Sequence, residues 1–381
     1  MFLKKLKLTN FRNYKDCEVD FPTNKTILVG KNAQGKTNLL EAIYYLATLS
    51  SYRASSDSEL IYMGESSTKI KAEINKNESD LTLDILINPP GNKVLKVNGI
   101  KKSKYSQFLG NLLVVSFSTI DLLIMRGSPS DRRKWIDDSI SQLYPVYIDR
   151  LSKYNKIRTQ KNNLLKDFKG NIHLNQSQKD SLSVWNEQLV ITGSNLIHLR
   201  QKYLKEIQKR AYKKHKHISI GEENLLLKYN STVTGDFNTE YDNIISPEKI
   251  SEIYSDILIE KQKEEIIRGQ ALIGPHRDDI SFFINNINAK SYASQGQQRT
   301  VVLALKLAEL DFIQDIIQDR PILLLDDVLA ELDTVRQNFL LDSIKEDIQT
   351  IITTVDISNF EPPYLEGVTI YNIEAGIVSK P

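Results

Sequence analysis

The sequence predicts an α/β fold whose two halves lie near opposite ends of the chain, separated by a mainly helical insert. Near the start, Gly30–Thr37 reads G-x-x-x-x-G-K-T between an apolar run and a helical pattern. Near the end, the apolar run Ile322–Leu325 is followed by two carboxylates, Asp326 and Asp327. From Lys36 to Asp326 the separation is 326 − 36 = 290 residues, far more than one compact α/β core needs.

The first segment has the pattern of a phosphate-binding P-loop. The apolar run Ile27–Val29 precedes it and a helical period follows it, which a chance glycine turn does not explain. Gly30 and Gly35 predict positive φ angles and a close approach of the backbone to an anion. Lys36 is expected to reach the β- and γ-phosphates and Thr37 to bind Mg²⁺. The expected ATP contacts are Gly30, Lys31, Asn32, Ala33, Gln34, Gly35, Lys36 and Thr37.

The second segment has the form of a Walker B strand, in which apolar residues end in carboxylates. Ligands of open α/β sheets bind at the carboxyl ends of the strands. Asp326 is therefore expected to hold Mg²⁺ and Asp327 to orient the attacking water, with Lys36 as the third catalytic residue. A helix cap after a core strand is the simpler alternative, because Asp is a common cap. The P-loop elsewhere in the chain favours the nucleotide site.

The composition is that of an ordinary soluble protein with one large or two smaller domains. Of the 381 residues, 40% are hydrophobic and 26% are charged. A single cysteine, Cys17, excludes an internal disulfide framework and is typical of a reducing cytosol. No apolar run approaches the roughly 20 residues of a membrane span. We therefore expect a cytoplasmic protein without a membrane partner.

The pattern along the chain changes from strand-rich to helical near Asp121. Alternation over residues 1–7 resembles an edge strand, and Asn98-Gly99 predicts a tight hairpin turn. Helical periods over 130–168 and 182–207 predict two long, antiparallel helices in an inserted arm, joined by a polar loop at 169–179. A further helix is predicted over 250–267, with Gly269 near its end.

Two polar segments flank the Walker B strand. The run S-Q-G-Q-Q-R at 294–299 begins a predicted helix and suits an anion-facing helix N-terminus. An ordinary polar cap is the alternative for this run when it is considered alone. Glu331 and Asp333 follow the carboxylates.

In this order the motifs resemble ABC-type ATPase heads, and further marks resemble the RecF family of bacterial DNA-repair ATPases, relatives of the SMC proteins. These marks are the run Asn38–Ile43 after the P-loop, Arg126–Pro129 followed by Arg132 and Arg133, G-P-H-R-D-D at 274–279 and S-Q-G-Q-Q-R at 294–299. The match runs from the first strand to about Asp356. Its last two marks are the most specific, because ordinary transporter ATPases do not share them.

The resemblance implies an α/β, ABC-type P-loop ATPase head. Lobe I would comprise residues 1–117 and 281–381, and a mainly helical lobe II would be inserted at 118–280. ATP and Mg²⁺ would bind between the subunits of an ATP-dependent homodimer. The segment that would contact the partner's nucleotide in trans is Ser294, Gln295, Gly296, Gln297, Gln298 and Arg299, with Glu331 and Asp333 in the D-loop. The family further implies double-stranded and gapped DNA as ligands, and action with RecO and RecR to load RecA in repair, replication and the SOS response.

The chain departs from the patterns of these relatives at three places. Thr119-Ile120 replaces the Pro-Glu that follows Phe117-Ser118 in the family. Asp327 stands where many ABC heads have Glu, and the shorter side chain predicts a slow, weak DNA-dependent ATPase. The region Thr353–Asp356 lacks the histidine of ABC transporters, which disfavours the chief alternative, an ATPase subunit of a membrane transporter. A small-molecule kinase and a head that binds ATP without cleaving it are further alternatives.

Two basic clusters are candidates for DNA contact. Residues 201–217 carry seven Lys or Arg against one Glu, and Lys209, Arg210, Lys213 and Lys214 form the proposed stripe. Lys101 and Lys102 form a second cluster beside the Asn98-Gly99 turn. A solvated surface is the alternative for both clusters. No base-reading motif is visible, so we expect backbone-directed, strongly salt-dependent binding.

His276, in the G-P-H-R-D-D run, allows two interpretations. It could act as a base or a ligand, and a satisfied structural histidine is the simpler explanation. No second His or Cys completes a metal cluster, so Mg²⁺ is the expected metal.

Overall fold

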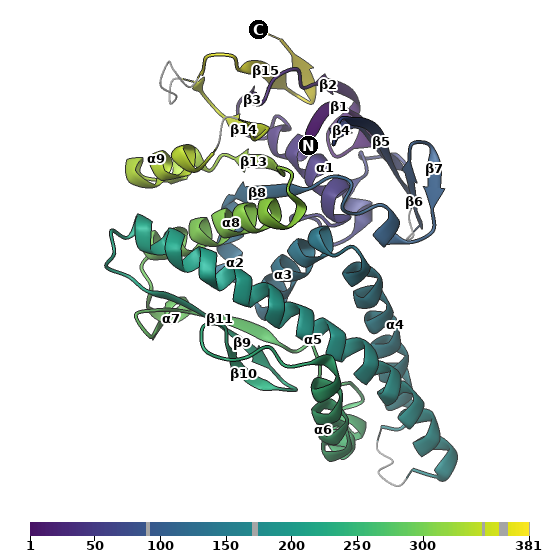
Figure 1. The fold of residues 1–381 in the computed structure, drawn as a ribbon. Coiled ribbons are helices and arrows are strands. Elements are labelled where there is room, and N and C mark those ends of the chain that lie inside the picture. The colour runs from purple at the N-terminus through teal and green to yellow at the C-terminus, as the bar shows by residue number, and fades with distance from the viewer. Residues whose placement is uncertain (89–91, 170–173, 345–346, 358–364, 381) are drawn as a thin grey trace. The chain divides into compact units, whose positions relative to one another are not determined.

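The computed structural model describes residues 1–88, 92–169, 174–344, 347–357 and 365–380, and Figure 1 traces their elements. The chain divides into two compact units. Unit 1 comprises Met1–Leu122, Ser141–Pro145 and Val302–Pro381, and unit 2 comprises Leu123–Ile140 and Val146–Val301. Residues 281–301 group with unit 2, so the units begin and end elsewhere than the three segments that the sequence predicts.

Unit 1 contains a six-stranded, mostly parallel sheet in the order β16-β15-β3-β14-β13-β8. Strands β13 and β14 are buried throughout, which explains why they appear in the sequence as short apolar runs without alternation. Helix α1 (Lys36–Thr48) contacts β8, β13 and β14. The strands are β3 (Lys25–Val29), β8 (Val114–Ser118), β13 (Ile322–Asp326), β14 (Thr350–Thr354), β15 (Thr369–Glu374) and β16 (Ile377–Ser379).

A second sheet of unit 1 is antiparallel, in the order β2-β1-β4-β5-β6-β7. Asn98 and Gly99 have φ angles of 51° and 76°, so the predicted tight turn between β6 and β7 is confirmed. The edge position predicted for the first strand is wrong: β1 pairs with both β2 and β4, and its charged residues lie on one solvated face. The strands are β1 (Phe2–Phe11), β2 (Tyr14–Asp20), β4 (Thr68–Lys76), β5 (Ser79–Asn88), β6 (Asn92–Val97) and β7 (Ile100–Lys102).

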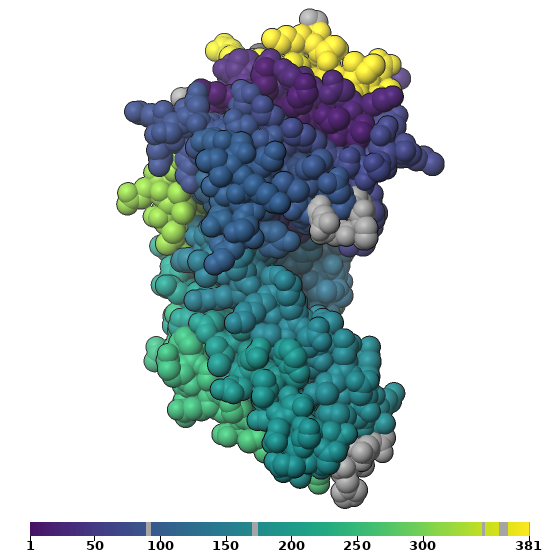
Figure 2. Space-filling view, turned by 90° about the vertical axis from the view of Figure 1, so that its right-hand side faces the viewer, coloured from purple at the N-terminus to yellow at the C-terminus, as the bar shows by residue number. Residues whose placement is uncertain are grey.

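The two ends of the chain come together within unit 1. Strand β15 pairs with β3, and β16 contacts β2. The Tyr371 hydroxyl of β15 donates a hydrogen bond to the carbonyl oxygen of Asp20 in β2. The purple N-terminal and yellow C-terminal strands accordingly lie side by side in Figures 1 and 2.

The first predicted arm helix is in fact two helices, α3 (Pro129–Leu143) and α4 (Val146–Asp167). Pro145 lies between them, has no N–H to donate and disrupts a continuous helix. The second arm helix, α5 (Gln176–Ile218), turns back along α4 (Figure 1). Asn175 caps α5 by accepting a hydrogen bond from the Gln178 N–H, so the predicted loop ends before residue 179. Residues 170–173 of that loop lie outside the described residues.

Unit 2 also contains a small sheet in the order β10-β9-β11-β12, and α5 contacts its strand β9. Helix α6 (Pro247–Arg268) ends at Gly269, whose φ of 65° confirms the predicted C-cap. The strands are β9 (Leu225–Ser231), β10 (Gly235–Asn238), β11 (Asp279–Ile284) and β12 (Ile287–Asn288). The insert is therefore helical with a four-stranded sheet added to it.

Helix α8 (Gln295–Ile317) begins in unit 2 and continues into unit 1 from Val302. The remaining elements are α2 (Leu123–Arg126), α7 (Ala289–Tyr292), α9 (Thr334–Ser343) and the short 3₁₀ turns Asp57–Leu60, Tyr105–Gln107, Thr119–Leu122 and Leu329–Glu331. Across the described ranges, no helix combines the length and the apolar character needed to cross a bilayer.

Candidate nucleotide site

The two predicted halves of the phosphate site meet in unit 1. The Thr37 hydroxyl at the start of α1 donates a hydrogen bond to Asp326 Oδ1 at the end of β13, with the two oxygens 2.9 Å apart. This contact follows from the strand order, because β14 lies between β3 and β13 and the three parallel strands end at one edge. Thr353, at the end of β14, donates to the same Oδ1 at 2.9 Å. The sequence analysis mentioned Thr353 only for the histidine it replaces and missed this contact.

The environment of Asp326 suits a hard divalent cation. Burial raises the pKa of its carboxyl group, while hydrogen bonds from Thr353 and Thr37 act in the opposite direction. A bound cation would favour the ionised carboxylate. Hydroxyl and carboxylate oxygens are the ligands that Mg²⁺ uses together with substrate phosphates. No group of three His, Cys, Asp or Glu that could hold another metal occurs within the described ranges.

Asp327 adopts an uncommon backbone conformation directly after the Walker B strand. Its φ of 53° lies in the left-handed region, which costs a non-glycine residue roughly 1 kcal/mol. The Asp327 N–H donates to Thr353 Oγ1 at 2.9 Å, which fixes this turn. The side chain is partly exposed, as a residue that orients a water molecule must be.

The loop itself partly differs from the predicted geometry. Gly35 has a φ of 121°, but the second left-handed residue is Ala33, with a φ of 65°, and not Gly30. At Gly30 an added Cβ would overlap the Ile373 carbonyl oxygen, so glycine permits close packing against β15. Lys36 is buried, and its ammonium group donates to the Gly30 and Lys31 carbonyl oxygens at 2.6 and 3.2 Å.

Two segments distant in sequence support the loop, and the sequence analysis found neither. From the β1–β2 turn, the Asn13 amide donates to the Gln34 carbonyl oxygen and the Tyr14 hydroxyl to that of Gly35, both at 3.0 Å. From the β15–β16 turn, the Ala375 and Gly376 N–H groups donate to Gln34, at 2.7 and 3.0 Å. Both chain ends therefore hold the loop. Asn and Gly at turns were the available signals, but such residues are too common to identify a partner.

Helix α1 is anchored by a buried ion pair. Both nitrogens of an Arg12 fork donate to the Glu41 carboxylate, at 2.8 and 2.7 Å, and the Ser51 hydroxyl also donates to it. Glu41 is fully buried, so this bidentate pairing is needed to offset its desolvation. Arg53 is exposed, bonds Asn38 at 2.7 Å and lowers the pKa of Asp326 through its charge. Arg53 is a further cation at the site that sequence reasoning missed.

The altered loop after β8 retains an ordered carboxylate. Asp121 accepts hydrogen bonds from the Ser118 N–H and hydroxyl, and its other oxygen lies 3.4 Å from Lys306 Nζ. Burial raises the pKa of Asp121, although Lys306 opposes that effect. Ser118 is the register partner of Asp326, so this loop starts beside the Walker B carboxylate.

The predicted signature segment begins α8 in unit 2. Ser294 is the N-cap: its hydroxyl accepts from the Gln297 N–H at 3.2 Å, and its N–H donates to Gln297 Oε1 at 2.8 Å. Ser294 and Gln295 are exposed, and Gly296 and Arg299 are partly so. Gln298 is buried, where its side-chain oxygen accepts from Arg126 Nε at 2.6 Å. The exposed residues can meet a ligand, whereas Gln298 supports the local fold.

In the D-loop region, Asp333 is the N-cap of α9 and accepts from the Arg336 N–H at 3.0 Å. Its carboxylate also pairs with the Arg336 guanidinium group. Glu331 lies in the short turn before α9 and is partly exposed. The described contacts of Asp333 are thus those of a helix cap.

The G-P-H-R-D-D run forms a buried polar network in unit 2. Arg200 is almost fully buried, makes two hydrogen bonds to Asp137 and donates to the Pro275 carbonyl oxygen at 2.6 Å. Asp278 is fully buried and accepts from the Tyr229 hydroxyl, and Asp279 takes a bidentate contact from Arg132. The family marks at 132–133 and 274–279 are therefore spatial partners.

His276 is a satisfied structural histidine. Its Nε2 lies 3.2 Å from the Ala271 carbonyl oxygen, which can only accept, so Nε2 carries the proton. Nδ1 then accepts from the Tyr154 hydroxyl at 2.6 Å. Burial lowers the pKa of His276 to about 3, although the hydrogen bond to Ala271 acts in the other direction. The imidazole is neutral at physiological pH.

The two basic clusters differ in structure. On α5, Glu206 lies within 2.9 Å of both Lys209 and Arg210, which partly neutralises the upper part of the stripe, while Lys213 is exposed. On the β6–β7 hairpin, Lys101 pairs in register with Lys96, which the sequence analysis missed. Like charges directly opposite one another in a sheet are destabilising, and a polyanion would relieve that repulsion.

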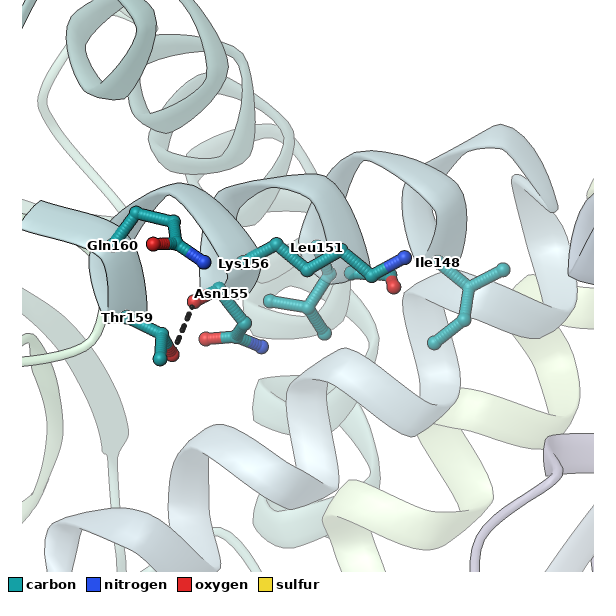
Figure 3. A pocket seen from close by; sticks show the side chains of 7 residues that line it. Ile148, Leu151, Asn155, Lys156, Thr159 and Gln160 are labelled. Atoms are coloured by element: carbon teal, nitrogen blue, oxygen red, sulfur yellow. Dashed lines mark hydrogen bonds between the residues drawn. The ribbon is translucent and has the colours of Figure 1, made fainter. Parts of the chain in front are cut away.

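A cavity of about 450 Å³ lies along α4 in unit 2 (Figure 3). Its lining, which includes Leu151, Asn155, Lys156 and Thr159, comes from that single helix. Lys156 is the one charged group in the lining, and the Thr159 hydroxyl bonds within the helix to the Asn155 carbonyl oxygen at 2.9 Å. Because polar groups from several elements do not converge there, we assign this cavity no chemistry.

Comparisons with known proteins cover the whole chain. Residues 2–372 match the family described as RecF/RecN/SMC N terminal domain. The chain is 41% identical over 381 residues to the DNA replication and repair protein RecF of Geobacillus kaustophilus, covering 100% of each chain. A solved structure titled as the recombination mediator protein RecF with ATP in the RecFOR pathway has a TM-score of 0.89 and 33% identity, covering 100% of this chain and 97% of that one. An Smc head from Pyrococcus furiosus, with a TM-score of 0.51 and 17% identity over 99% of this chain and 95% of that one, shares the fold.

Proposed function

The chain belongs to the RecF family of DNA replication and repair proteins, and from this premise we propose that it is an ATP-dependent DNA-binding protein of recombinational repair. The observation that carries the proposal is the hydrogen bond between Thr37 and Asp326, which unites both halves of a phosphate site. Unit 1 is the ATPase lobe and unit 2 the inserted lobe. ATP and Mg²⁺ bind at the P-loop, with Thr37 and Asp326 holding the metal, which neutralises phosphate charge when bound.

Two copies of the chain would enclose the nucleotide. Ser294 and Gln295 are exposed at the start of a 23-residue helix, where backbone N–H groups and the helix dipole attract phosphate. ATP would therefore join P-loop and signature surfaces from different subunits. Hydrolysis is slow because Asp327 reaches less far than Glu, and DNA accelerates it.

The ligand of the dimer is duplex DNA next to a gap, bound through its phosphates. Exposed lysines on α5 and on the β6–β7 hairpin supply the charge. Action with RecO and RecR to load RecA follows from the family and from the pathway that titles the solved relative. The family match does not favour a transporter ATPase.

Mass photometry tests the proposal. We expect a monomer without nucleotide, and a dimer with Mg²⁺ and a non-cleavable ATP analogue, stabilised further by gapped duplex DNA. Lys36→Ala should remain monomeric under all conditions. A wild-type protein that stays monomeric when saturated with analogue and DNA contradicts the proposal.

A further inference from the structure

The first turn of α8 is oriented by a residue outside the predicted signature segment. The Gln297 side chain accepts from the Ser294 N–H at 2.8 Å through Oε1. Its Nε2 donates to Glu223 Oε1 at 2.7 Å. Glu223 lies in the turn between α5 and β9, more than 70 residues away in sequence.

Glu223 determines which way round the Gln297 amide lies. An amide offers an acceptor at one end and donors at the other, and the two ends have nearly the same shape. A carboxylate only accepts, so it selects the NH₂ end and leaves the carbonyl oxygen for the Ser294 N–H. Without Glu223 the amide is free to turn over, and its NH₂ group would then face the Ser294 N–H, donor against donor.

Glu223 is itself held at the end of the basic helix. Its Oε2 lies 3.5 Å from Nε2 of His215, a buried residue in the last turn of α5. The next residue, Asn224, exchanges hydrogen bonds of 2.9 and 3.0 Å with Asn285. The turn is therefore fixed to α5 on one side and to the β11–β12 connection on the other.

We propose that Glu223 is a positioning residue for the signature serine, and that it couples the C-terminal end of the basic helix to the segment that contacts nucleotide. This inference rests on the proposed function, because it assumes that Ser294 meets ATP on a second copy of the chain. Glu223 touches no reacting atom and acts through Gln297. A shift of the α5 terminus on DNA binding would move the carboxylate and change the Ser294 cap.

The test compares Glu223→Ala with Glu223→Gln in ATP-analogue-dependent dimerisation of the full chain. Glu223→Ala should weaken dimerisation about tenfold, because a hydrogen bond to a charged group is lost. ATP binding to the monomer should stay unchanged. Glu223→Gln can still accept from the Gln297 amide and should restore most of the affinity. Glu222→Ala, at the exposed neighbouring position, should behave as wild type.

A Gln297→Ala background separates positioning from general damage to the fold. There, Glu223→Ala should have no further effect on dimerisation. Additive losses, or a Glu223→Gln variant as weak as Glu223→Ala, would overturn the inference. If wild type and Glu223→Ala dimerise equally, the inference alone fails; if wild type never dimerises, the proposed function fails.

Discussion

The two surfaces proposed to enclose the nucleotide are built in opposite ways. The P-loop of unit 1 is held by hydrogen bonds from both ends of the chain, and its lysine is buried. The signature turn of unit 2 is exposed and is held by its own helix cap and one carboxylate. The first is rigid before any ligand arrives, whereas the second depends on a few side chains that another event can move. Nucleotide capture and subunit closure can therefore be separated by mutation.

The largest effect is expected from Lys36→Ala on the P-loop side. Loss of the ammonium group that reaches the β- and γ-phosphates should lower ATP hydrolysis by at least about 100-fold. A phosphate-release assay measures this, with Lys15→Ala at an exposed position of β2 as the control. Hydrolysis within a few-fold of wild type would show that the P-loop is not the catalytic half of the comparison.

Ser294→Asp should separate the two surfaces. Asp preserves the N-cap, so helix stability should be kept, but its charge would oppose a triphosphate. We expect ATP-dependent dimerisation to weaken by more than about tenfold while monomer ATP affinity stays unchanged. Analytical ultracentrifugation with and without analogue measures the first quantity and equilibrium dialysis the second. An equal loss of both would mean that the two surfaces do not act separately.

Charge reversal on α5 should leave both nucleotide surfaces intact. Lys213→Glu with Lys214→Glu should weaken duplex DNA binding about tenfold and lower the slope against salt concentration by about two. Lys209→Glu should have less effect, because Glu206 already pairs with Lys209. Lys179→Glu, at the exposed start of the same helix, is the matched control. Unchanged DNA affinity across a salt series would exclude the α5 stripe.

The smallest effect concerns the stability of unit 2 in acid. The folded-state pKa of His276, about 3, lies below its ordinary value of 6.5, so the unfolded chain binds more protons between these values. The contribution of His276 to stability is therefore complete above pH 6.5 and is lost as pH falls toward 3, by at most about 1.4 kcal/mol per pH unit. His276→Gln should show a flatter dependence of the urea midpoint on pH. His217→Gln, at an exposed position, should not.

The sequence was informative where function and local pattern coincide. The P-loop, the Walker B strand and the Gly269 cap each follow from a short motif, and each lies where the motif predicts. The break at Pro145 was also predictable, because proline ends a helix. The helical period continues across it, since α3 and α4 each keep an apolar face, and this concealed the break.

Contacts between distant segments could not be predicted from one sequence. Asn13 and Gln34, or Glu223 and Gln297, are single polar residues whose meeting depends on the complete topology. The Arg200–Asp137 pair requires buried charges that no local period reveals. Such pairs decide how well the site is oriented, and they appear only when the elements have packed.

The position of β15 and β16 beside the P-loop has a consequence for biosynthesis. Ala375 and Gly376 supply hydrogen bonds to Gln34, so these contacts form only after almost the whole chain has left the ribosome. A nascent chain, or a fragment truncated before residue 369, would carry the complete glycine motif without the outer half of its support. Competence to capture nucleotide would thus arrive last in synthesis, which protects a half-made molecule from engaging a partner too early.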